Sequence, residues 1–258
     1  MDRKMFSKFF KLKIVLSLLG LYIFTSPIAY AAISLPNINI SMQNASTPQE
    51  FTQGVQVLIM LTILTLAPSI IIMTTAFIRI VIVLSLTRQA IGTASLPPNQ
   101  VIVGLALILT FFVMSPTLSK INETAYQPYM KNMITQQQAL DNSMKPIREF
   151  MFKQVQEPEL ALFVKLAKLE KPKNKDDVPT YVLIPSFVLS ELKTAFKIGF
   201  VIFLPFLVID LVVASVLVSM GMMFLPPTTI AMPFKLIMFV MVDGWFLITK
   251  SLIEGFGG

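Results

Sequence analysis

The feature that most constrains this chain is the gathering of its apolar residues into four long blocks. The blocks cover residues 55–86, 101–118, 198–225 and 229–249, and each contains few charges. About 20 apolar residues cross the hydrocarbon core of a bilayer as a helix, so each block is long enough to be a membrane helix. Hydrophobic residues make up 55% of the chain and charged residues only 14%, with a mean hydropathy of +0.73. The sequence therefore predicts an all-α, polytopic membrane protein.

Helix-breaking residues group the four blocks into two helical hairpins. Gly92 and the segment 97–99, Pro-Pro-Asn, separate the first two blocks, and Pro226-Pro227 separates the last two. We therefore expect a first hydrophobic helical hairpin over residues 55–118 and a second over residues 198–258.

Two further prolines lie inside the blocks. Pro68 is expected to divide the first block, and Pro205 lies in the third. A proline inside a helix removes a backbone hydrogen bond and favours a kink. The alternative is a break that binds a substrate, as in transporters.

Residues 119–197 form a polar insert between the hairpins, and it too is predicted to be helical. Pro158-Glu159 opens a second helix in the insert, and the charged segment 171–177 ends that helix as a solvated loop. If the chain crosses the membrane four times and its N-terminus is translocated, we expect the insert on the outer side. Its basic residues do not contradict this, because the preference of Lys and Arg for the cytoplasmic side applies to loops of up to about 60 residues. The first helix carries an apolar stripe of Met133, Leu140, Met144, Ile147, Met151 and Val155.

The N-terminus has the pattern of a secretory signal. A basic start is followed by an apolar segment at residues 14–24. The tripeptide Ala29-Tyr30-Ala31 then has the small residues of a signal-peptide cleavage site. We expect residues 1–31 to be a cleaved signal peptide, because the apolar segment is shorter than the roughly 20 residues of a span. The alternative is an uncleaved anchor. Residues 32–54 lack apolar periodicity and are predicted to be an exposed N-terminal lead-in.

Composition excludes several classes of function. The chain contains no Cys and no His, so disulfides, thiolate nucleophiles, Ser-His-Asp triads and the usual zinc sites are ruled out. It also contains no phosphate-binding loop of the Walker type. The net charge of +7 arises largely from basic residues near the N-terminus, which gives no reason to expect a nucleic-acid partner. These absences remove most hydrolase chemistry, and we expect the chain to need no metal or cofactor.

Four charges interrupt the apolar blocks: Arg79, Asp210, Lys235 and Asp243. A charge at the centre of a helix that faces lipid costs about 2.5–3.5 kcal/mol on the insertion scale. We therefore expect these side chains to face protein, water or one another. Pairing that fixes assembly is the favoured interpretation. A proton or ion relay, or a place beyond the membrane boundary, are the alternatives.

The two aspartates, Asp210 and Asp243, raise two alternative functions. A proton-coupled secondary transporter could use them as a relay, and an intramembrane aspartyl protease would need them to face each other. The chain lacks the Gly-x-Gly-Asp context of such proteases, and its two hairpins share little beyond hydropathy. Both alternatives are therefore weak.

Several long segments are distinctive, beginning with the run AFIRIVIVLSLTRQAIGT at residues 76–93 and ending with VDGW at residues 242–245. Together they resemble the FliP family of the flagellar type III export gate, and the resemblance runs from about residue 50 to the C-terminus. Their number and order make coincidence an unsatisfactory explanation. The segments are residues 76–93, 97–101, 111–116, 190–200, 205–212, 226–227, 233–236 and 242–245.

The resemblance implies a core subunit of the export gate that is not an enzyme. Several copies would join two smaller membrane proteins, FliQ-like and FliR-like, in a helical, conical assembly with a central channel. Unfolded flagellar proteins would pass through it, powered by other components of the export apparatus. The implied location is the bacterial inner membrane and its periplasmic face, at the flagellar basal body. The hairpins would then pack largely against neighbouring subunits.

Candidate assembly residues follow from the charges and from the resemblance. Glu191, Lys193 and Asp210 can pair with neighbours where apolar surface becomes buried. Phe150 and Phe163 resemble aromatic residues of the family that lie in subunit contacts, although packing of the helix stripe explains them equally well.

The candidate channel constriction is the segment 222–224, Met222, Met223 and Phe224. Methionine is unbranched and polarizable, so a ring of it can seal a channel and then repack around a passing chain. Gly221 and Pro226-Pro227 disfavour helix on either side. The alternative is that the three residues only fill a core. The family resemblance favours a gasket, although the family commonly has a third Met where this chain has Phe224.

Overall fold

The structure is a computed structural model that describes residues 48–93, 96–222 and 224–257, and all regular structure in these residues is helical. The chain divides into two compact units, residues 1–59 and 60–258. The predicted signal peptide (1–31) and most of the predicted lead-in lie outside the described residues.

Helix α2 (Pro48–Met73) begins before the first apolar block and continues through Pro68. The prediction that Pro68 divides the block is wrong, because the helix ends only at Met73. There the hydroxyl of Thr74 donates to the carbonyl of Ile70 at 3.0 Å and so competes for a helix acceptor.

Helix α3 (Phe77–Ile91) follows after a three-residue break. It ends at Gly92, whose φ of +88° is the left-handed conformation that glycine adopts without strain. The N–H of Gly92 bonds to the carbonyl of Gln89 and so satisfies one free carbonyl at the helix end. This is the turn that the sequence predicted between the first two blocks.

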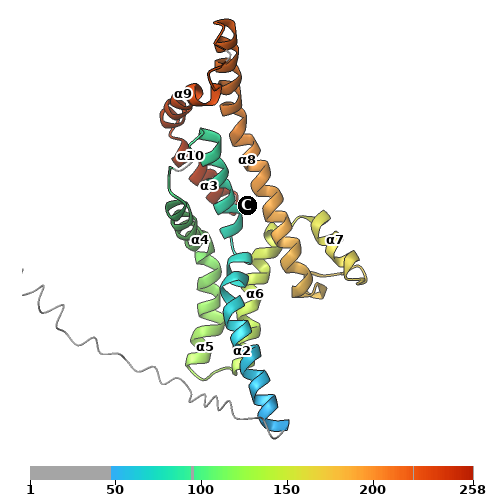
Figure 1. The fold of residues 1–258 in the computed structure, drawn as a ribbon. Coiled ribbons are helices and arrows are strands. Elements are labelled where there is room, and N and C mark those ends of the chain that lie inside the picture. The colour runs from blue at the N-terminus through green and yellow to red at the C-terminus, as the bar shows by residue number, and fades with distance from the viewer. Residues whose placement is uncertain (1–47, 94–95, 223, 258) are drawn as a thin grey trace, which may run out of the picture. The chain divides into compact units, whose positions relative to one another are not determined.

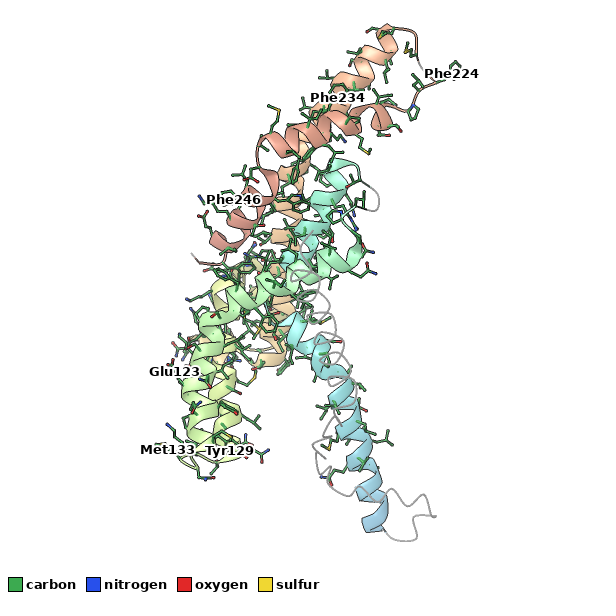
Figure 2. The ribbon with its side chains drawn as sticks, turned by 90° about the vertical axis from the view of Figure 1, so that its left-hand side faces the viewer. Glu123, Tyr129, Met133, Phe224, Phe234 and Phe246 are labelled. Atoms are coloured by element: carbon green, nitrogen blue, oxygen red, sulfur yellow. The ribbon has the colours of Figure 1, made fainter. Side chains whose placement is uncertain are left out.

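Helix α4 (Asn99–Ile121) runs into the polar insert without a break. A π-helical turn, η1 (Asn122–Tyr126), and the short α5 (Gln127–Met130) extend it, and α6 (Gln136–Gln154) runs back. A capping box starts α6, since the hydroxyl of Thr135 accepts from the N–H of Gln138 while the Gln138 side chain accepts from the N–H of Thr135. Figure 2 shows Tyr129 and Met133 at the turn of this helical pair.

The next helices are α7 (Glu157–Leu166), the single turn η2 (Lys175–Asp177) and α8 (Thr180–Ser219). Helix α8 has 40 residues and contains Pro185 and Pro205 without ending at either. The boundary expected at residue 197 between insert and second hairpin therefore falls inside one helix.

The last apolar block forms two helices instead of one. Helices α9 (Pro227–Met241) and α10 (Gly244–Glu254) meet at an angle of 61°. Asp243 lies between them with a φ of +50°, and Gly244 starts α10 against the ring of Phe239. A Cβ atom at Gly244 would lie 2.2 Å from Cε2 of Phe239, so the bend requires glycine there.

Within residues 60–258, α3 lies between α4 and α8, and α7 packs on another side of α8 (Figure 1). Helix α8 approaches α3 closely at Gly199, where a Cβ atom would lie 2.2 Å from Cδ1 of Leu86. The main core combines residues of α3, α4, α6, α8 and the C-terminal segment. A second, smaller cluster joins α3, α8 and α9 and consists of Ala90, Ile91, Phe206 and Phe239.

Three helical segments among the described residues are long and apolar enough to cross a membrane. They are Val55–Met73, Asn99–Met130 and Thr180–Ser219, and the bent pair α9–α10 makes a fourth if it counts as one span. The prediction of an all-α protein with membrane helices is confirmed in this form for the described residues.

Candidate functional site

A buried ion pair between Arg79 and Glu191 joins α3 to α8. The side chain of Glu191 is completely buried, and Arg79 is 4% exposed. Nε of Arg79 donates to Oε2 of Glu191 at 2.8 Å, and Nη2 donates to Oε1. A guanidinium that binds a carboxylate through two parallel hydrogen bonds is a strong and directional pair.

Arg79 also fixes the C-terminal segment and α6. Its Nη1 donates to the carbonyl of Gly255 at 3.2 Å, and its Nη2 donates to Oε1 of Gln154 at 2.8 Å. The guanidinium carbon lies 3.9 Å from the ring centroid of Phe256, close enough for a cation–π interaction. One buried cation therefore connects α3, α6, α8 and the C-terminus.

A second ion pair joins α8 to α9. Nζ of Lys235 donates to Oδ2 of Asp210 at 2.6 Å, and Lys235 is 5% exposed. Two of the charges that the sequence places in apolar blocks thus pair with each other.

The third ion pair joins α7 to α8. Nζ of Lys193 donates to Oε1 of Glu159 at 2.6 Å, and this hydrogen bond lowers the pKa of the Glu159 carboxyl below its ordinary value. The side-chain amide of Gln156 donates to the hydroxyl of Thr194 at 3.0 Å and supports the same contact.

Asp243 is placed differently from the other three charges in the apolar blocks. It is exposed at the bend between α9 and α10, and among the described residues its carboxylate has no hydrogen bond or ion pair. Its backbone conformation explains the residue type, because Asp adopts a positive φ more readily than most residues.

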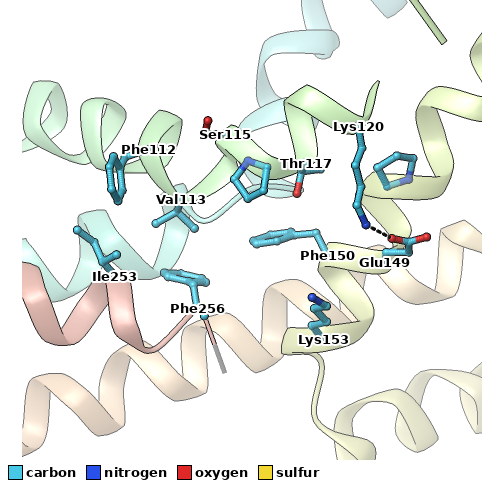
Figure 3. A pocket seen from close by; sticks show the side chains of 13 residues that line it. Phe112, Val113, Ser115, Thr117, Lys120, Glu149, Phe150, Lys153, Ile253 and Phe256 are labelled. Atoms are coloured by element: carbon cyan, nitrogen blue, oxygen red, sulfur yellow. Dashed lines mark hydrogen bonds and ion pairs between the residues drawn. The ribbon is translucent and has the colours of Figure 1, made fainter. Parts of the chain in front are cut away.

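Phe150 is buried inside the chain, where it stacks on Phe256 with ring centroids 6.2 Å apart and meets the edge of Phe187 at 5.9 Å. It also lines a cavity of about 540 Å³ between α4, α6 and the C-terminal segment, which Figure 3 shows. Phe163 on α7 is half-buried against the main core.

The candidate constriction lies in the turn between α8 and α9. Phe224 is fully exposed and Met222 is 42% exposed, while Met223 lies outside the described residues. Gly221 has a φ of +73°, so the chain leaves α8 there in a left-handed conformation. Figure 2 shows Phe224 at the far end of α8 and α9, away from the turn that carries Tyr129.

The three ion pairs lie within one chain and therefore do not test whether the predicted assembly residues contact a second subunit. Glu191, Lys193 and Asp210 each have an ion-pair partner inside the chain. Contacts of these residues with a second subunit stay a prediction, as do those of Phe150 and Phe163.

Sequence reasoning missed the partners of Arg79. Gln154, Gly255 and Phe256 lie 75 or more residues away along the chain, and no local pattern connects them to Arg79. Among the described residues, no group of three His, Cys, Asp or Glu side chains could hold a metal ion.

Comparison with known proteins gives a consistent result. The sequence model of the FliP family matches residues 60–252. The chain is 52% identical over 217 residues to the flagellar biosynthetic protein FliP of Bacillus subtilis, covering 84% of this chain and 98% of that protein. It is 50% identical to FliP of Pectobacterium carotovorum, covering 91% and 90% of the two chains, and 49% identical to FliP of Caulobacter vibrioides, covering 89% and 85%. The alternative of a proton-coupled transporter receives no support.

Proposed function

Since this chain belongs to the FliP family of flagellar type III export-gate proteins, we propose that several copies of it form a protein-conducting channel with two smaller membrane proteins. It is a membrane protein of the flagellar export apparatus, and its family has a structural role there. The smaller partners are FliQ-like and FliR-like, and the assembly is helical and conical. It lies at the inner membrane and its periplasmic face and exports unfolded flagellar proteins.

The observation that carries this proposal is the uncovered apolar surface of α8. A helix of 40 residues is about 60 Å long, roughly twice the thickness of the hydrocarbon core. Exposed apolar side chains occur along its whole length: Tyr181 near its start is 66% exposed, Phe200 near its middle is 64% exposed, and Val218 near its end is 59% exposed. A bilayer alone therefore cannot cover this helix, and neighbouring subunits supply the remaining cover.

The segment 222–224 closes the channel in this proposal. Its fully exposed Phe224 and exposed Met222 extend from a turn instead of filling the core of their own chain. Such side chains from several copies can form an apolar ring that excludes ions and repacks around a passing chain.

The remaining regions have separate roles. Residues 1–31 direct the chain to the membrane and are then removed, and residues 32–54 precede the first hairpin (55–118). The insert (119–197) lies on the periplasmic side, and the ion pair of Lys193 with Glu159 holds α7 on α8 there. With α7 fixed, the exposed part of Phe163 contacts a neighbouring subunit.

Co-expression of the tagged chain with its two smaller partners tests the proposal. Native mass spectrometry of the purified membrane complex should show several copies of this chain together with both partners. A chain that purifies alone or as a simple dimer, although all three proteins are present in the membrane, would contradict the proposed assembly.

A further inference from the structure

A cavity of about 430 Å³ lies beside the ion pair of Asp210 with Lys235. The end of α3, the middle of α8 and the first half of α9 form its walls. Its lining includes Gln89, Gly92, Phe203, Phe206, Thr229 and Met232.

The ion pair at this cavity uses only part of its hydrogen-bonding capacity. Oδ2 of Asp210 accepts from Lys235, but Oδ1 is buried and has no partner among the described residues. The ammonium group of Lys235 has three N–H donors, and Asp210 is the one acceptor that the described residues provide. Buried polar groups in native proteins almost always have partners, so a further group belongs at this site.

The surface around the cavity shows what kind of molecule supplies that group. Leu207 and Leu211 of α8 are 48% and 59% exposed, and Phe234 of α9 is 56% exposed. This apolar surface is covered in the membrane or in an assembly. Lipid chains cannot donate or accept a hydrogen bond, whereas a helix of another protein can place one polar side chain there.

The charge balance at the site restricts that side chain. Asp210 and Lys235 neutralise each other, so a third charge would be buried without compensation. The missing group must donate to Oδ1 of Asp210 and accept from Nζ of Lys235. A hydroxyl and a carboxamide can each do both without a charge, but only a carboxamide does so through two separate atoms, NH₂ and C=O, which suits two groups that lie side by side.

We propose that the Asn or Gln carboxamide of a neighbouring subunit's apolar helix enters this cavity and completes the Asp210–Lys235 pair. The inference rests on the proposed assembly, since it names the contact that one interface of that assembly contains. The ion pair is then a specific recognition point in an otherwise apolar interface.

Site-specific photo-cross-linking in the complete gate tests the contact directly. A photo-reactive amino acid replaces Met232, which lines the cavity, and the same amino acid replaces Met241 as a control. Nine residues along α9 place Met241 on the opposite face of the helix, where it is 81% exposed. The Met232 probe should attach to another chain within one helical turn of an Asn or Gln, and the Met241 probe should not attach there. Attachment only to lipid or detergent, or to a helix without a carboxamide, would overturn the inference.

A double substitution separates the contact from the stability of the chain. Asp210→Leu with Lys235→Met removes both charges together, so the chain should accumulate in the membrane as the wild type does. The partner carboxamide would lose both hydrogen bonds, and the yield of complex should fall about tenfold. A double variant that assembles as well as the wild type would overturn the inference. Failure of the wild-type chain to join a complex would instead count against the proposed function itself.

Discussion

Replacement of Glu191 by Ala should destabilise the chain strongly, because it leaves a buried cation without its counter-ion. Arg79 would keep only the carbonyl of Gly255, the side chain of Gln154 and the ring of Phe256 as partners. Breaking a buried ion pair by removing one partner costs about 3–5 kcal/mol. At about 2–4 °C per kcal/mol for a chain of this size, the apparent Tm should fall by roughly 10 °C.

Thermal unfolding of the purified chain in detergent measures this effect, with two variants for comparison. Lys120→Ala removes an ion pair in which both side chains are more than half exposed, at 59% and 60%, and should change stability by less than about 1 kcal/mol. Arg79→Met combined with Glu191→Leu removes both charges and should recover most of the lost stability. The reasoning is refuted if Glu191→Ala melts within about 2 °C of the wild type.

Three further predictions concern the channel, the insert and the signal. Replacing all three residues of the segment 222–224 by Gly should leave assembly intact and let small ions leak across vesicles, whereas an ion-tight mutant complex would place the seal elsewhere. Because the pKa of Glu159 is lowered in the folded chain, its bond to Lys193 stabilises the fold above the ordinary carboxyl pKa of about 4.3 and is lost as pH falls through the lowered value. The Tm difference between wild type and Glu159→Gln should therefore shrink on acidification. A Tm difference that does not change with pH would contradict a stabilising bond from ionised Glu159 to Lys193. Intact-mass measurement of membrane-purified protein should show a chain that begins at Ala32, and full-length chain as the main species would exclude cleavage after residues 1–31.

The elements that the sequence predicted well are those with strong local signals. Long apolar blocks gave helices, Gly92 ended α3, and Pro227 started α9 at a position where proline is favoured. The apolar stripe of the insert predicted the amphipathic helix α6, although its first and last residues, Met133 and Val155, lie just outside that helix. The capping box at Thr135 is also a local pattern.

The elements that the sequence did not predict depend on contacts between distant segments. Glu191 lies 112 residues from Arg79, and Gly255 lies 176 residues from it, so no periodicity within one helix could connect them. The bend at Asp243-Gly244 had a local signal, since Asp tolerates the positive φ that Asp243 adopts and Gly is a common helix breaker, but the surrounding hydropathy obscured it. At Pro68 the sequence predicted a break that the structure does not contain, because α2 continues through this proline.

A single-particle reconstruction of the complex purified through this chain tests the central claim most directly. The account predicts several copies of the chain around a central channel, with the segment 222–224 of each copy at the narrowest point. A complex without a central channel, or one in which Phe224 faces lipid on the outside, would contradict it.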